Sequence, residues 1–138
     1  MYDDRKIKDI YKCESIEAVG EIYPLQKWYN QLIDKTISQI DVSDVLRMFR
    51  QKEFIDIAII KAVEYLKEDP FIGDMYDGEL LEKLSSINRD ILMKYTNEIK
   101  DILSNALEKN DDYEWLDATE RIEFAEKIKQ FRDKLGTL

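Results

Sequence analysis

The chain has 138 residues, of which 44% are hydrophobic and 37% charged, and its formal net charge is −9. These values predict one folded domain over residues 1–138, and they argue against a disordered chain or two domains of ordinary size. With no histidine and one cysteine, the chain excludes histidine-based nucleophilic catalysis, histidine-ligated zinc and cysteine-ligated clusters, so we expect no cofactor and no metal.

The N-terminal residues MYDDRKIKDIYKC are mixed in charge and lack the apolar region of a secretory signal. The longest apolar run, Ile57 to Ile60, is far shorter than the roughly 18–20 residues that a membrane span needs. The acidic field repels phosphate backbones and anionic lipids, so we expect no direct binding to nucleic acid or membrane. Because the lone Cys13 suits a reducing compartment, we predict a cytoplasmic protein.

Helical periodicity dominates the N-terminal third of the chain. A short helix is expected within residues 4–13, and a second short segment follows Ser15 and ends near Gly20. Pro24 suits the first position of a longer helix, because proline lacks the amide hydrogen that a first turn leaves unbonded. An apolar stripe then runs along residues 25–37, as one face of a helix requires.

A central helix is expected over residues 53–68. Asp41 or Ser43 first caps a short helix that presents Phe49 to the core. The segment EFIDIAIIKAVEYLKE then confines its polar residues to one narrow stripe, which indicates the helix at the centre of a bundle. Its β-branched residues also suit a buried strand, but the pattern continues too long for one.

Two long helices complete the predicted fold. One runs from Asn88 for about five turns. The other runs from Asp117 to Leu135, with Asp117 and Glu120 at capping-box spacing and Gly136 as its C-cap. The sequence therefore predicts an all-α, single-domain bundle of about six or seven helices.

The segment LKEDPFIGDMYDGELLEKL, residues 66–84, is rich in carboxylates and invites a metal-site interpretation. Neither glycine register places oxygen ligands where a calcium-binding EF-hand loop needs them. The pairs Glu79/Glu82 and Glu98/Asp101 resemble the magnesium motif of all-α nucleotide pyrophosphohydrolases, which makes that enzyme the alternative hypothesis. With 30 acidic residues in the chain, however, such pairs recur by chance.

Two connecting segments combine acidic with aromatic residues, as a contact surface for a basic protein partner would. Rings supply buried contact area, and carboxylates supply charge complementarity and fast encounter. In the alternative interpretation each ring, including Phe71 and Trp115, folds back over the core. The candidate partner-binding residues are Asp69, Asp74, Tyr76, Asp77, Glu79, Asp111, Asp112, Tyr113 and Glu114.

The stretches KWYNQLIDKTISQIDVSDVLRMFRQ, FIDIAIIKAVEYLKEDP and MYDGELLEKL occur in this order. Over residues 28–84 the chain resembles the α-helical immunity proteins of bacterial contact-dependent growth inhibition (CDI) systems. The resemblance implies a non-enzymatic antidote that binds the C-terminal toxin domain of a cognate toxin and occludes its active site or substrate path. It implies no catalytic residue, and it assigns no toxin contact to a particular position.

The implied toxin is often a nuclease, which needs a basic cleft to hold phosphates. An acidic immunity protein is the electrostatic counterpart of such a cleft, and the net charge of −9 agrees with that role. A helical adaptor or a nucleic-acid mimic that occupies a DNA-binding protein is a third hypothesis.

Overall fold

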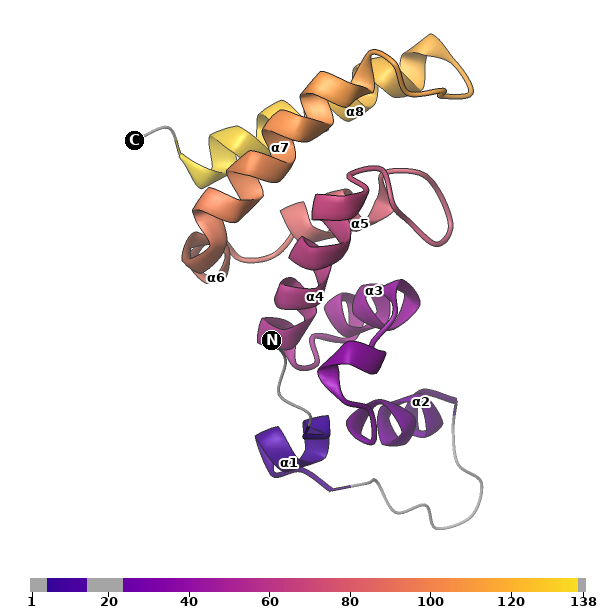
Figure 1. Cartoon of the computed structure of the whole chain (residues 1–138), viewed down its shortest axis with the longest axis vertical. Helices are drawn as coiled ribbons and strands as arrows, with labels where there is room; N and C mark the ends of the chain where they lie inside the picture. Colours follow the sequence, from indigo (N-terminus) through magenta and orange to yellow (C-terminus); the bar gives the residue numbers. More distant parts are fainter. Residues whose placement is uncertain (1–4, 15–23, 137–138) are drawn as a thin grey trace.

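The computed structural model describes residues 5–14 and 24–136, and in this part the chain is helical (Figure 1). The predicted all-α fold is confirmed: the described residues form helices and one isolated β-bridge between Lys6 and Thr36. The helices are α1 (Ile7–Tyr11), α2 (Pro24–Ile33), η1 (Ile37–Gln39), α3 (Val42–Gln51), α4 (Ile55–Glu68), α5 (Glu79–Ser85), α6 (Arg89–Leu92), η2 (Met93–Tyr95), α7 (Thr96–Asn110) and α8 (Ala118–Leu135). The segment expected between Ser15 and Gly20 lies outside the described residues.

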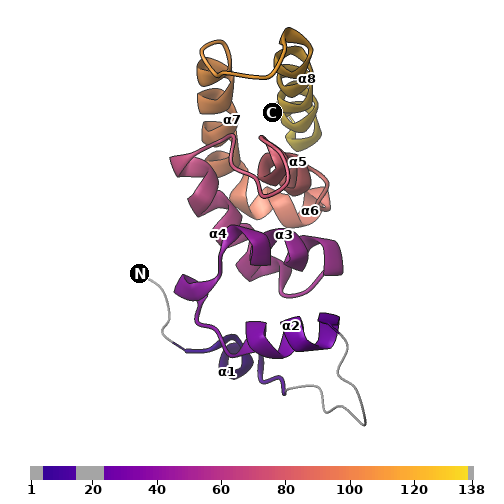
Figure 2. The same ribbon diagram turned by 90° about the vertical axis from the view of Figure 1, so that its right-hand side faces the viewer.

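The helices stack along one long axis, with α1 and α2 at one end and the pair α7–α8 at the other (Figures 1 and 2). Helix α4 joins the two ends, because it packs against α3, α5 and α7. The prediction that this segment is the central helix is confirmed. Its buried residues are Ile57, Ala58, Ile59, Lys61, Ala62, Val63 and Leu66.

The N-terminus of α3 is fixed by a reciprocal cap that also ties α3 to α2. Asp41 is the N-cap, and its carboxylate accepts a hydrogen bond from the Asp44 amide at 2.7 Å. Asp44 is buried, accepts a hydrogen bond from Trp28 Nε1 at 3.2 Å and pairs with Lys35 at 2.5 Å. The Asp44 carboxylate therefore takes part in the helix cap, accepts the indole hydrogen bond and pairs with the ammonium group.

Replacing Asp44 with alanine should lower the free energy of unfolding by about 2–3 kcal/mol, because the buried Trp28 N–H loses its acceptor and Lys35 loses its counter-ion. Asparagine at the same position keeps an acceptor for the indole, so its loss should be about 1 kcal/mol. Urea unfolding followed by circular dichroism measures both values. Equal losses for the two variants would contradict the role given to the indole hydrogen bond.

The helix predicted to run unbroken from Asn88 is in fact interrupted. Asn88 caps the one-turn α6, the 3₁₀-helix η2 follows, and only at Thr96 does the long α7 begin. The Thr96 hydroxyl donates to the Met93 carbonyl at 2.9 Å. A threonine hydroxyl that bonds a nearby backbone carbonyl competes with the hydrogen bonds of the helix. The spacing of apolar residues gives no sign of this competition.

Helix α8 begins and ends where the sequence predicts. Asp117 is its N-cap and accepts from the Glu120 amide at 2.9 Å, while Gly136 is the C-cap with φ of 88°. The Glu120 carboxylate does not complete a capping box with Asp117. It accepts instead from the Leu116 amide at 3.1 Å, one residue earlier, and so anchors the loop that precedes the helix.

Candidate functional site

The two acidic and aromatic segments singled out in the sequence lie against each other. Phe71, from the loop of residues 69–78, is buried and stacks on Tyr113, from the loop of residues 111–117, with ring centroids 3.9 Å apart. Trp115 and Phe124 complete an aromatic cluster, and their rings lie 5.7 and 5.2 Å from Phe71. Phe71 therefore folds back into the core, and Tyr113 and Trp115 pack against it while remaining partly exposed.

The loop of residues 69–78 is held by hydrogen bonds to its own backbone. The Glu79 carboxylate, which is only 7% exposed, accepts from the amides of Asp74 and Met75, both at 2.8 Å. The Gly78 amide donates to the Phe71 carbonyl at 2.7 Å. At Gly73 a Cβ atom would lie 2.0 Å from the Tyr76 carbonyl oxygen, so only glycine fits this turn. These contacts fix the loop tip, residues 74–77, in an exposed position.

The second loop, residues 111–117, is held by two residues that the sequence analysis did not single out. Arg121 donates to the carbonyls of Asn110 and Tyr113, at 3.1 and 2.8 Å. The Asn110 side chain accepts from Trp115 Nε1 at 2.8 Å and donates to the Arg121 carbonyl at 3.1 Å. Because Asn110 is buried, these bonds replace the water that its amide loses on folding.

The predicted partner-binding residues differ in their accessibility. Tyr113 is half-buried in the aromatic cluster and Glu79 is buried under its loop. Desolvation, followed by the effect of the Asp77 carboxylate, raises the pKa of Tyr113 to about 12. The exposed members of the set are Asp69, Asp74, Tyr76, Asp77, Asp111, Asp112 and Glu114.

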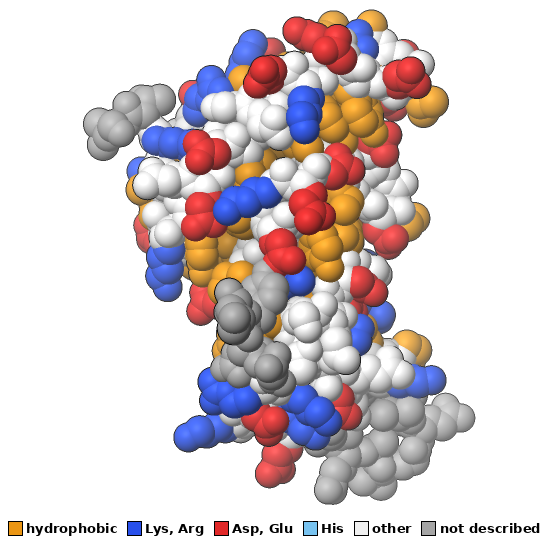
Figure 3. Space-filling model, in the orientation of Figure 1, with side chains coloured by type: hydrophobic (Ala, Val, Ile, Leu, Met, Phe, Trp, Pro, Cys, Tyr) orange, Lys and Arg blue, Asp and Glu red, His pale blue; other side chains and the backbone are white. Residues whose placement is uncertain are grey.

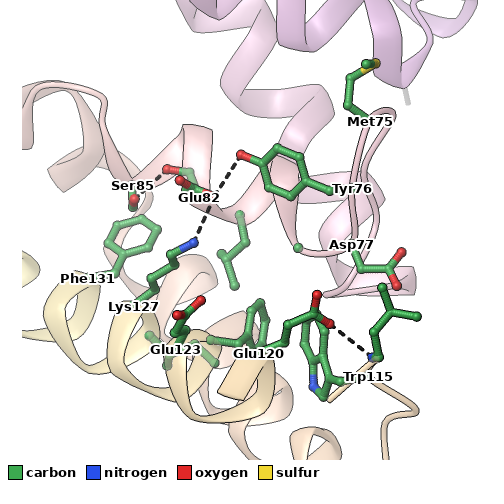
Figure 4. Close-up of a pocket in the computed structure, with 15 residues that line it drawn as sticks. Met75, Tyr76, Asp77, Glu82, Ser85, Trp115, Glu120, Glu123, Lys127 and Phe131 are labelled. Carbon is green, nitrogen blue, oxygen red and sulfur yellow. Dashed lines mark hydrogen bonds and ion pairs between the residues drawn. The ribbon is translucent and has the colours of Figure 1, made fainter. Parts of the chain in front are cut away.

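A groove lies between α5 and α8, beside both loops, with a volume of about 450 Å³ (Figure 4). Its floor is apolar, and its charged lining consists of four carboxylates and one ammonium group. The apolar floor residues include Leu81, Phe124, Ile128 and Phe131, and the charged residues are Asp77, Glu82, Glu120, Glu123 and Lys127.

Glu82 already has a positive partner within the groove. Its carboxylate accepts from the Tyr76 hydroxyl at 2.8 Å and from Lys127 Nζ at 3.1 Å. Burial raises the pKa of Glu82, but these two hydrogen bonds outweigh it and hold the pKa below its ordinary value. Desolvation, followed by the bond to Glu82, raises the pKa of Tyr76 to about 12. Glu82 is therefore charged and internally neutralised at pH 7.

Sequence reasoning missed the contribution of α8 to this groove. Glu120, Glu123 and Lys127 follow one another at spacings of three and four, so they share a face of the helix. That spacing could have indicated a charged face on α8 from the sequence alone. The other missed residues, Met75 and Leu116, are loop hydrophobics that are 81% and 94% exposed at the groove.

The alternative magnesium site does not form. Glu79 is committed to its loop and Glu82 to Tyr76 and Lys127, while Glu98 pairs with Lys67 at 3.6 Å on α4. Across residues 5–14 and 24–136, no group of three or more histidine, cysteine or acidic side chains could hold a metal ion. The four carboxylates that the alternative hypothesis would bring together, Glu79, Glu82, Glu98 and Asp101, therefore do not form a metal site in the described part of the chain.

Figure 3 shows acidic side chains mixed with basic ones and with exposed apolar patches over the half of the molecule that contains α4, α5, α7 and α8.

No helix among the described residues is long and apolar enough to cross a bilayer.

Comparison with known proteins gives one family and no curated relative. A family model described as CDI immunity proteins matches residues 9–102, about two thirds of the chain. The match ends within α7, so α8 and the loop of residues 111–117 lie beyond it. No curated protein sequence matches the chain.

Proposed function

This chain belongs to the family of CDI immunity proteins, and we propose that it neutralises the C-terminal domain of a cognate toxin by binding it in the cytoplasm, one to one and without catalysis. Membership in the family implies a toxin partner. The proposal adds that the partner is a basic nuclease domain and that binding covers its active site or the path of its substrate.

The observation that carries the proposal is the joining of the two loops with the groove into one surface, here called the acidic face. We define the acidic face as the exposed residues of the loops 69–78 and 111–117 together with the α8 wall of the groove. Its anchors for contact area are Met75 and Leu116, which are almost fully exposed. Its carboxylates outnumber its basic groups, which favours a positively charged partner.

The charge of the acidic face fits a toxin that handles nucleic acid. A nuclease needs a positive cleft to bind phosphates, and a protein that fills this cleft with carboxylates competes directly with the substrate. Complementary charge also accelerates encounter, which suits an antidote that must bind before the toxin damages the cell.

A co-expression experiment tests the proposed function. The toxin domain encoded immediately upstream should arrest growth when it is expressed alone. Growth should resume when the immunity protein is co-expressed, and the two chains should elute together from a sizing column as a 1:1 complex. Continued growth arrest with no complex would refute the proposal.

The electrostatic part of the proposal predicts a kinetic effect. Replacing Asp74 and Asp77 with lysine should slow association with the toxin at least about tenfold at low salt and flatten its dependence on salt concentration. The matched control replaces Asp9 and Asp56 with lysine, because both are exposed and belong to α1 and to the start of α4 rather than to either loop. Stopped-flow association rates measure the difference. If both double variants slowed equally, net charge rather than this loop would govern encounter.

A further inference from the structure

The groove between α5 and α8 has apolar surface that continues from its floor to both of its edges. Leu81 on α5 and Phe124 on α8 contribute to the floor, while Met75 and Leu116 come from the two loops. Met75 and Leu116 are 81% and 94% exposed in the free protein. Their apolar side chains would be buried only if another chain entered the groove. An occupant must therefore bring at least one apolar side chain.

The charges of the groove are not equivalent. Glu82 is neutralised by Lys127. Glu120 uses one oxygen, Oε2, to hold the Leu116 amide. Glu123 has no hydrogen-bond or ion-pair partner among residues 5–14 and 24–136. The negative charge that remains available on α8 is thus at Glu120 and Glu123, and the exposed Asp77 adds to it from the loop of residues 69–78.

Glu120 and Glu123 lie three residues apart on one turn of α8, and Figure 4 shows both side chains at the groove. Lys127 follows one turn later and pairs with Glu82 at the Glu82 end of the groove. A cation that enters the groove is attracted to Glu120 and Glu123, whereas the Glu82–Lys127 pair is neutral as a whole and attracts it less. This arrangement defines the direction in which an amphipathic segment can lie.

We propose that the groove receives a single segment of the toxin that carries an arginine or lysine next to an apolar side chain. This inference rests on the proposed function and deepens it. The apolar side chain packs on Leu81 and Phe124, and the cationic group binds at Glu120 and Glu123. Because the Glu82–Lys127 pair is neutral as a whole, the toxin cation binds at Glu120 and Glu123 instead, and this difference sets the direction of the segment.

Two single substitutions test the contacts, and each has a matched control on α8. Glu123→Lys and Leu116→Ser alter side chains with no structural role in the described fold, so lost affinity reports lost contact. Glu126→Lys makes the same change, and Ile122→Ser a comparable aliphatic-to-serine change, at exposed α8 positions outside the groove lining. With the purified cognate toxin domain as the probe, Kd should rise at least tenfold for the first pair and stay within about twofold for the controls.

A photo-crosslinking residue at Leu116 identifies the occupant. Mass spectrometry of the irradiated complex should place the adduct on one toxin peptide that contains an arginine or lysine beside an apolar residue. An adduct to a second copy of this chain, or none at all, would overturn the inference. A toxin complex whose Kd is unchanged by Glu123→Lys and Leu116→Ser would also overturn the inference. In that case the proposed function would stand. Absence of any complex with the unaltered chain would instead refute both.

Discussion

Replacing Phe71 with alanine is expected to lower the free energy of unfolding by about 3–5 kcal/mol, the range measured for buried phenylalanines. The Phe71 ring is 5% exposed and contacts Tyr113, Trp115 and Phe124, which come from the second loop and from α8. Its removal leaves a cavity at the point where α8 and the two loops meet, so the acidic face should lose its shape as well. Toxin affinity should fall even though the ring is buried in the free protein.

Urea unfolding gives the stability of the Phe71→Ala variant, with circular dichroism reporting all helices and Trp fluorescence reporting chiefly the surroundings of Trp28 and Trp115. The variant Phe71→Leu serves as the control, because it keeps much of the volume and should cost less than Phe71→Ala. A Phe71→Ala protein as stable as the unaltered chain would contradict the view that this ring joins the loops. Unchanged toxin affinity in a Phe71→Ala variant that is destabilised as expected would contradict the view that this ring shapes the acidic face.

Most of the helices could be predicted from the sequence because their signals are local. Pro24 at the first position of α2, Asp41 before α3 and Gly136 after α8 mark helix ends through backbone chemistry that does not depend on the rest of the fold. The break between α6 and α7 was missed, because the apolar residues continue through it in helical register. Only the Thr96 hydroxyl bond to Met93 and the 3₁₀ turn reveal it.

The two loops of the candidate site could be predicted from the sequence. That they lie side by side and form one surface could not. Composition drew attention to both loops. Their contact through Phe71 and Tyr113 joins positions 42 residues apart, a separation at which periodicity carries no information. Whether a carboxylate faces outwards is also a tertiary property: Asp74 and Glu79 lie in the same acidic run, yet one is exposed and the other is buried. The role of α8 depends on its position opposite α5, which the sequence does not specify.

The Glu79 carboxylate offers a test that separates loop support from direct toxin contact. Replacing Glu79 with alanine should lower the free energy of unfolding by about 2–4 kcal/mol, because the amides of Asp74 and Met75 lose a charged acceptor in a buried site. The tip of the loop should then move, and toxin affinity should fall with it. Thermal and urea unfolding, together with toxin titration by calorimetry, measure the two effects.

Glutamine at position 79 is the decisive comparison. Both amides donate to the same oxygen of Glu79, Oε1, so a glutamine carbonyl can accept both bonds at a cost of about 1 kcal/mol for the lost charge. If Glu79 only supports the loop, Glu79→Gln should bind the toxin nearly as tightly as the unaltered chain. If its charge meets the toxin directly, as the sequence alone predicts, Glu79→Gln should weaken binding as much as Glu79→Ala. The burial of the carboxylate favours the first result, because a charge covered by its own loop attracts a partner less than Asp74 and Asp77 do at the exposed tip.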